Sequence, residues 1–233
     1  MQTIMGFIVD GCSIALGGLL GGFLQKRVNT KNFSALSIGI MLISVVGLLE
    51  NILSISDGRI VGEHTVVVTV ALIAGFTIGN ALKLEERICS LSKSKHTKHS
   101  GLIDSVLFFG IGGLQISGPI LYAIEGDSFQ LILKGIIDFP FALMLGATYG
   151  KKVSLSAFFV VMIQLMIAIP AALLGNFIND NLLCQLCSLG YVILFFSGFN
   201  MICPPQGKIQ NINIIPGILL IIIYNVLMEV FLL

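Results

Sequence analysis

The sequence predicts an all-α fold, a polytopic bundle of about eight transmembrane helices. The first observation is composition: 56% of the 233 residues are hydrophobic and 11% are charged, whereas soluble domains average about 25% charged residues. The second is that apolar stretches long enough to cross a hydrocarbon core recur along the chain. These stretches are continuous rather than alternating, which argues against a β-barrel. We therefore expect one integral membrane domain over residues 1–233.

Eight apolar stretches define the expected spans. They are Met5–Leu24, Phe33–Ile52, Val66–Leu84, Gly101–Ile124, Phe129–Gly150, Leu155–Phe177, Leu182–Ile202 and Ile214–Leu232. No basic leader precedes the first stretch, and Lys26 and Arg27 follow it, which is typical of a retained helix rather than a secretory signal. The fourth stretch is expected either to cross the membrane or to form a re-entrant element.

Basic residues gather in alternate loops between these spans. Of the thirteen Lys and Arg residues, eleven lie after the first, third, fifth and seventh spans, Arg59 lies in another loop, and Lys134 lies within a span. The remaining loops carry mainly acidic residues. Because cytoplasmic loops are enriched in Lys and Arg, the positive-inside rule predicts that the N-terminus and the C-terminus both lie outside.

The two halves of the chain, 1–125 and 126–233, resemble each other. Each begins with a glycine-containing span that ends in two basic residues, and the following span opens with Ser34 in one half and Ser156 in the other. The halves would have the same orientation, and parallel repeats occur in transporters with the substrate path at their interface. The alternative to this 4+4 repeat is convergence among small-residue helices with basic cytoplasmic ends.

Glycines recur at the spacing that lets helix backbones approach closely. GxxxG pairs occur at Gly17 and Gly21, at Gly18 and Gly22, at Gly75 and Gly79, and at Gly146 and Gly150. The spacing favours packing inside the bundle, and a homo-oligomer interface is the alternative.

The fourth stretch concentrates glycines and polar residues in its middle. Gly112, Gly113, Gly118 and Pro119 are expected to break the helix, and Gln115 and Ser117 lie among them. Proline removes a backbone donor and glycine lowers helix propensity. Freed carbonyls at membrane depth persist only where protein or a wet cavity satisfies them. The stretch therefore predicts either a broken helix that supplies backbone ligands or a kinked, tightly packed helix.

Lys134 and Asp138 are two ionisable residues within the fifth stretch. Charges at membrane depth are expensive unless they are paired or hydrated, and a spacing of four residues places both on one helix face. Pro140 is expected to distort the helix beside them. The pair predicts a proton or cation relay, or a counter-ion pair broken by substrate. A structural ion pair between helices is the alternative.

Three further polar residues fall within expected spans. Asp10 lies in the outer part of the first span, either as an interfacial carboxylate or, if deeper, protonated or in contact with Lys134. Gln164 and Asn200 can hydrogen-bond in a bundle core and are either part of a solute pathway or interhelical contacts.

Sequence motifs for catalysis or metal binding are missing from the chain. It contains neither HExxH nor GxSxG, and Cys184-x-x-Cys187 lies in an apolar stretch without a second such pair. We therefore expect no enzyme activity, no catalytic or metal-binding residue and no cofactor. The expected partners are the lipid bilayer and a small solute or ion, and not a nucleic acid.

Several motifs together resemble those of one bacterial family. They are Met5-Gly-Phe-Ile-Val-Asp10, Leu16-Gly-Gly-Leu-Leu-Gly21, Gly75-Phe-Thr-Ile-Gly79, the Gly112 to Gly118 core, Lys134-Gly-Ile-Ile-Asp138, Gln164 and Gly198-Phe-Asn200. Over nearly its full length the chain is similar to the membrane proteins of the domain of unknown function 554 family (YqgA/YdfK-like). That pattern usually has Asn where this chain has Asp10, and Cys and Met where it has Gly110 and Leu114. The resemblance implies a prokaryotic inner-membrane protein without an assigned activity.

The intramembrane polar residues predict a small transporter or channel for an ion or small polar solute. Lys134, Asp138, Asp10, Gln115, Ser117, Gln164 and Asn200 would lie near its pathway. The second hypothesis is a membrane scaffold or regulatory subunit in which the charged pair is structural.

Overall fold

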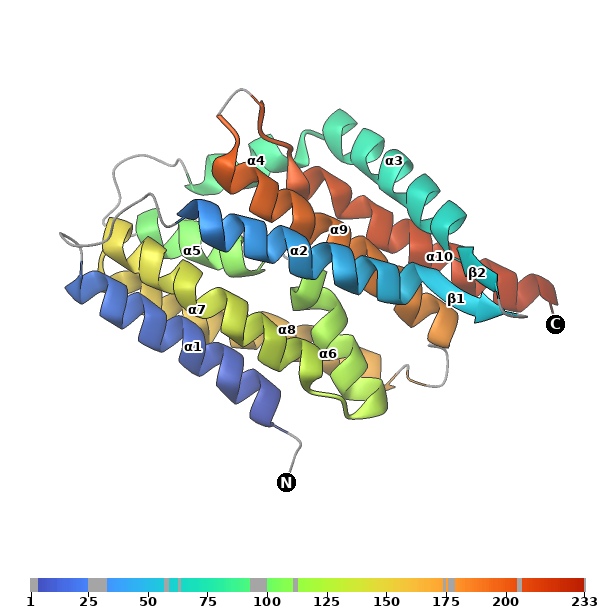
Figure 1. The fold of residues 1–233 in the computed structure, drawn as a ribbon, viewed down its shortest axis with the longest axis horizontal. Helices are drawn as coiled ribbons and strands as arrows, with labels where there is room; N and C mark the ends of the chain where they lie inside the picture. Colours follow the sequence, from blue (N-terminus) through green and yellow to red (C-terminus); the bar gives the residue numbers. More distant parts are fainter. Residues whose placement is uncertain are drawn as a thin grey trace. The chain divides into compact units, whose positions relative to one another are not determined.

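The computed structural model shows a helical protein with one small β-hairpin (Figure 1). It describes residues 4–24, 33–56, 59–62, 64–92, 100–110, 113–173, 175, 179–204 and 207–232. The helices in these ranges are α1 (Met5–Phe23), α2 (Phe33–Ile52), α3 (Thr65–Ala81), α4 (Leu84–Ser92), α5 (Ser100–Gly110), α6 (Gly113–Glu125), α7 (Phe129–Tyr149), α8 (Ser156–Leu173), α9 (Asp180–Ile202) and α10 (Pro216–Leu232). Short 3₁₀ turns at Lys151–Leu155 and Asn211–Ile214 precede α8 and α10.

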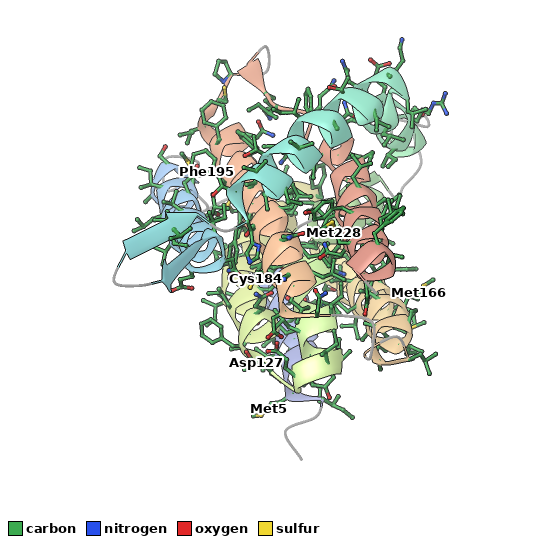
Figure 2. The ribbon with its side chains drawn as sticks, turned by 90° about the vertical axis from the view of Figure 1, so that its right-hand side faces the viewer. Met5, Asp127, Met166, Cys184, Phe195 and Met228 are labelled. Atoms are coloured by element: carbon green, nitrogen blue, oxygen red, sulfur yellow. The ribbon has the colours of Figure 1, made fainter. Side chains whose placement is uncertain are left out.

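Five described segments are long and apolar enough to cross a membrane, by length and composition. They are Met5–Phe23, Phe129–Tyr149, Lys151–Leu173, Asp180–Asn200 and Asn211–Glu229, and Ser37–Ile52 and Thr65–Ala81 are shorter apolar helices. One face of α8 exposes Phe158, Met162, Met166, Ile169 and Leu173 at helical spacing, and Met166 of this face is labelled in Figure 2. An apolar stripe of this kind suits a hydrocarbon environment. The prediction of a helical, membrane-capable protein is confirmed.

Two elements between the predicted spans differ from expectation. Strands β1 (Leu53–Ser56) and β2 (Arg59–Gly62) form an antiparallel hairpin in which Leu53 pairs with Gly62. The third helix ends at Ala81 rather than Leu84, and Lys83 takes a positive φ of 52° before α4 begins. Such a left-handed residue cannot continue a right-handed helix. The segment from Leu84 therefore forms a separate short helix.

The helices are not broken at the prolines, where the sequence predicts either a break or a kink at Pro119 and a distortion at Pro140. Helix α6 continues through Gly118 and Pro119, and α7 continues through Pro140. A proline removes one hydrogen bond, and the flanking bonds keep each helix continuous. Within the fourth predicted span, the structure describes α5 up to Gly110 and α6 from Gly113. Gly112 lies outside the described residues.

The chain forms two compact units. Unit 1 comprises Met1–Phe33 and Ser90–Gly175, and unit 2 comprises Ser34–Cys89 and Asn176–Leu233. Unit 1 therefore contains α1 and α5 to α8, whereas unit 2 contains α2 to α4, α9, α10 and the hairpin. Each unit takes helices from both halves of the sequence.

In unit 1, α1 and α7 lie parallel and unusually close (Figure 1). Contacts pair residues 125 apart, such as Gly6 with Leu131 and Gly17 with Ala142, and Figure 2 shows Met5 and Asp127 at the same end of the unit. The closest approaches are reciprocal: Gly21 faces the carbonyl of Leu143, and Gly146 faces the carbonyl of Gly18. Glycine is required at this seam because a Cβ would meet backbone atoms, as the predicted close packing demands.

In unit 2, small residues also bring antiparallel helices together. Gly75 of α3 faces Gly217 at the start of α10, and Gly79 faces Asn213 in the 3₁₀ turn that precedes α10. Buried Asn213 accepts a hydrogen bond from the Glu85 amide at 3.0 Å. Burial raises the pKa of the Glu85 carboxyl, against the opposite effect of the hydrogen bond that the Ile212 amide donates to it. Backbone and side-chain contacts thus fix the junction between α3, α4 and α10.

Candidate functional site

The Lys134/Asp138 pair lies inside unit 1 and not on its outer surface. Lys134 is 4% exposed and Asp138 is 7% exposed. One helical turn of α7 separates them, and Lys134 Nζ donates a hydrogen bond to Asp138 Oδ2. The predicted pairing on one helix face is therefore confirmed.

Asp10 joins the pair from α1. Its side chain is fully buried, and its Oδ2 atom accepts hydrogen bonds from Lys134 Nζ at 2.9 Å and from Gln164 Nε2 at 2.6 Å. Gly135 permits this contact, because a Cβ there would lie 3.0 Å from Asp10 Cα. The carboxylate lies roughly 8 Å along α1 from its first residue, given a rise of 1.5 Å per residue. The predicted contact of Asp10 with Lys134 is confirmed, and the depth of Asp10 in the membrane stays a prediction.

Two glutamines extend this cluster to α8 and α6. Gln164 Nε2 also donates to Gln115 Oε1 at 3.2 Å, and Gln115 Nε2 donates to the Val160 carbonyl at 3.1 Å. Both glutamines are fully buried. A continuous hydrogen-bonded chain thus runs from Asp138 through Lys134, Asp10 and Gln164 to Gln115. We call these five side chains the polar cluster.

The polar cluster carries an uneven charge and two unsatisfied oxygens. Its two carboxylates face one ammonium group, so full ionisation would leave one net negative charge. Among the described residues, no hydrogen-bond donor reaches Asp10 Oδ1 or Gln164 Oε1, although both atoms are buried. Buried polar atoms in native proteins usually have a partner. Both unsatisfied atoms are acceptors, so they suit a proton or a cation and not an anion.

An apolar layer covers the polar cluster on the side of the first residues of α1 and α7. Phe7, Leu131 and Ala168 form a buried hydrophobic cluster, with Tyr122 and Val161 packed against it. The rings of Phe7 and Tyr122 meet edge to face with centroids 4.9 Å apart. Phe7 and Leu131 each lie three residues before a charged member of the cluster. The layer therefore separates the charges from that end of the unit.

The other predicted pathway residues lie outside this chain of hydrogen bonds. Ser117 of α6 donates to Gln130 Oε1 of α7 at 2.6 Å. Asn200 belongs to unit 2, where its amide pairs with both backbone groups of Ile209, at 2.6 and 2.8 Å. Gln130 is not among the residues predicted from the sequence. Its position four residues before Lys134, on the same face of α7, is the signal that could have identified it.

Metal binding has no support in the described ranges. No three His, Cys, Asp or Glu side chains converge there as a metal site requires. The chemistry available to the polar cluster is proton exchange and the binding of a small cation or hydrogen-bond donor.

Gln164→Leu is expected to destabilise the protein by about 1 to 3 kcal/mol, because Gln115 Oε1 loses the donor that Gln164 supplies and Asp10 Oδ2 keeps only the hydrogen bond from Lys134. Unfolding by titration with SDS in mixed micelles measures the change. Gln210→Leu is a matched control at a half-buried glutamine of unit 2, whose side-chain oxygen accepts a hydrogen bond from Asn213, three residues further along the chain. The prediction would be contradicted if Gln164→Leu lowered the stability no more than Gln210→Leu does.

Comparison with known proteins identifies the family of this chain. A family profile described as "Protein of unknown function (DUF554)" matches residues 5–226. The chain belongs to the DUF554 family. The family assignment confirms the predicted resemblance and includes both Asp10 and the α7 pair within the matched region.

Two relatives align with almost the entire DUF554 chain. The "Uncharacterized membrane protein YdfK" of Bacillus subtilis (strain 168) is 26% identical over 228 residues, which cover 93% of each chain. The "Uncharacterized protein YqgA" of Escherichia coli (strain K12) is 24% identical over 230 residues, covering 93% of this chain and 94% of the relative. No solved structure matches the chain. The description of the first relative as a membrane protein agrees with the apolar helices of this chain.

Proposed function

We propose that this protein is a small membrane transporter or channel for an ion or small polar solute, with the polar cluster on its pathway. The observation that carries the proposal is the burial of three ionisable side chains, Asp10, Lys134 and Asp138, within one unit. Ionisable residues inside membrane proteins are rare and usually mark ion pathways or proton relays. Neither an enzyme activity nor a cofactor is part of the proposal.

The proposed pathway runs through unit 1 along the polar cluster. It would begin beyond the apolar layer of Phe7 and Leu131, pass Asp10 and Lys134, and reach Asp138 near the middle of α7. The apolar layer would act as a gate, because dewetted hydrophobic constrictions block ions. In the proposed arrangement, the close packing of α1 and α7 at their glycines would close the pathway beyond Asp138.

The proposed topology is one integral domain with eight spans in the inner membrane and both termini outside. In this arrangement α5 and α6 together make the fourth span as two half-helices. The 4+4 parallel repeat is supported by the reciprocal contacts of Gly21 and Gly146, since equivalent residues of two repeats would approach each other in this way. Homo-oligomerisation remains a separate proposal, because the seam glycines are used within the chain.

The second candidate is a membrane scaffold or regulatory subunit. It is favoured by the complete burial of Asp10, Gln115 and Gln164, whose hydrogen bonds tie α1, α6 and α8 together. Hydrogen bonds between helices commonly stabilise membrane bundles without any transport role.

Flux through proteoliposomes separates the two functions. We expect wild-type protein to carry flux above the empty-vesicle level, and Asp138→Asn to lower it at least about tenfold, equivalent to about 1.4 kcal/mol in the barrier. The substitution removes one of the two carboxylates that contact Lys134, so the ammonium group can no longer alternate between them.

The matched control is Asp127→Asn, the same substitution at an exposed residue of unit 1. Its flux should equal that of the wild type. Wild-type flux at the empty-vesicle level, across a broad panel of ions and metabolites, would exclude transport and favour the scaffold. Equal flux in Asp138→Asn and wild type would exclude the pair from the pathway.

A further inference from the structure

We propose that the polar cluster is a proton-binding site, and that at neutral pH one proton resides on Asp10 and is shared with Gln164. The proposal deepens the proposed function by naming the ion, and it uses the same site. It is carried by the charge of the cluster and by the two buried oxygens that lack donors.

The charge count requires one additional positive charge. Asp10 and Asp138 supply two carboxylates, Lys134 supplies one ammonium group, and all three are less than a tenth exposed. On α7 and α1, these are the charged groups that the structure places in the cluster. The neighbouring helices α8 and α6 contribute the neutral side chains Gln164 and Gln115. An uncompensated buried charge costs several kcal/mol, so one bound proton makes the cluster neutral.

The unsatisfied atoms indicate where the proton resides. Gln164 Nε2 donates to Asp10 Oδ2, which leaves Asp10 Oδ1 and Gln164 Oε1 as the second atoms of the same two planar groups. A proton on Asp10 Oδ1 can be donated to Gln164 Oε1. The carboxylic acid and the amide then form two hydrogen bonds in one ring, and a single proton satisfies both orphaned oxygens.

A metal cation fits these atoms less well than a proton. A hard cation is held by many oxygen ligands, about six to eight for calcium. The cluster offers two unsatisfied oxygens in its described part, and Lys134 lies against Asp10 at 2.9 Å and would repel a second cation. A proton requires one donor and one acceptor, which Asp10 and Gln164 provide.

Asp138 provides a second carboxylate beside Lys134, so the proton can leave Asp10 without leaving the cluster charged for long. Lys134 contacts both carboxylates, so the ammonium group can balance whichever one is ionised. The proton moves from Asp10 to a water molecule or to Asp138, and the O–H bond that breaks is replaced by one on the acceptor. The two carboxylates therefore form one proton-binding site with Lys134 between them.

Infrared spectroscopy of the purified full-length protein in nanodiscs tests the site without any flux measurement. At neutral pH we expect a carboxylic-acid C=O band in the wild type that shifts in D2O. Difference spectra should show this band lost in Asp10→Asn and in Asp138→Asn, because either variant leaves one carboxylate balanced by Lys134. Lys134→Met should about double the band, and Asp127→Asn, at an exposed carboxylate, should leave it unchanged.

Gln164→Leu tests the shared position, because it keeps all three charged groups. We expect its acid band to remain and to move to higher frequency, since the acid loses its amide partner. An unshifted band would overturn the placement on Asp10.

If a variant fails to fold, the spectrum of the wild type alone can still refute the proposal. Absence of an exchangeable acid band at neutral pH overturns it, and a thermal stability that then depends on sodium rather than choline would assign the site to a metal cation. Failure of the proposed function is distinct: an acid band with no flux in proteoliposomes leaves the proton site and removes transport. Flux in the absence of the carboxylic-acid band would leave the transport proposal standing and would exclude the bound proton.

Discussion

Lys134→Met should destabilise the protein by about 3 to 5 kcal/mol, the cost typical of removing one partner from a buried ion pair. Lys134 donates to both Asp10 and Asp138, and neither carboxylate is more than a tenth exposed. Without the ammonium group, each carboxylate must take up a proton or remain charged in an apolar interior. Methionine is close to lysine in length, so the loss of stability mainly measures the effect of the missing charge and not of a changed side-chain volume.

The midpoint of SDS-induced unfolding measures this effect, compared at pH 5 and pH 8. The loss should be larger at pH 8, because both carboxylates of the variant must bind protons and fewer are available there. Lys208→Met, at an exposed lysine of unit 2, should change stability by less than about 0.5 kcal/mol. A midpoint for Lys134→Met within the range of this control would mean that the cluster does not depend on its ammonium group.

Gly21→Ala should be the second most damaging change, at about 3 kcal/mol, the upper end of the usual cost of overpacking. The added methyl group would meet the Leu143 carbonyl and the Ala147 amide, which belong to the backbone of α7. A backbone cannot rotate away as a flexible side chain can. The two helices must separate, and the contact between Asp10 and Lys134 two to three turns away is then strained.

Gly39→Ala is the matched control in another apolar helix. A Cβ at Gly39 would meet nothing within 4 Å, so this change should stabilise α2 by about 0.5 to 1 kcal/mol through helix propensity. The same unfolding assay compares both variants. If Gly21→Ala is as stable as Gly39→Ala, the close seam of α1 and α7 is not required for the fold.

The long helices were predictable because their signal is local. Apolar runs indicate α1, α7, α9 and α10 almost to the residue, since each run must match the thickness of the hydrocarbon core. The hairpin of β1 and β2 was missed although Asp57-Gly58, a common hairpin dipeptide, joins the two strands in the sequence. Its strands are only four residues each, too short for a clear periodic signal.

The candidate site was only partly predictable because its contacts are tertiary. The Lys134/Asp138 pair follows from spacing along one helix, and this pairing is confirmed. The contact of Gln164 with Asp10 joins residues 154 positions apart, and nothing local specifies which face of α8 meets α1. Asn200 shows the converse: an intramembrane asparagine that suggested a pathway binds the backbone of a nearby loop.

The separation of Asp10 and Lys134 by 124 positions has a consequence for biosynthesis. At a translation rate of about 5 to 20 residues per second, Asp10 is made on the order of ten seconds before its lysine. During that interval α1 carries an acidic side chain without its counter-ion, and insertion into lipid is favoured only if that side chain is neutral or wet. We therefore expect α1 to stay at the insertion machinery, or to bind a proton, until α7 has been made. Assembly of this protein would then be timed by the emergence of a single basic residue from the ribosome.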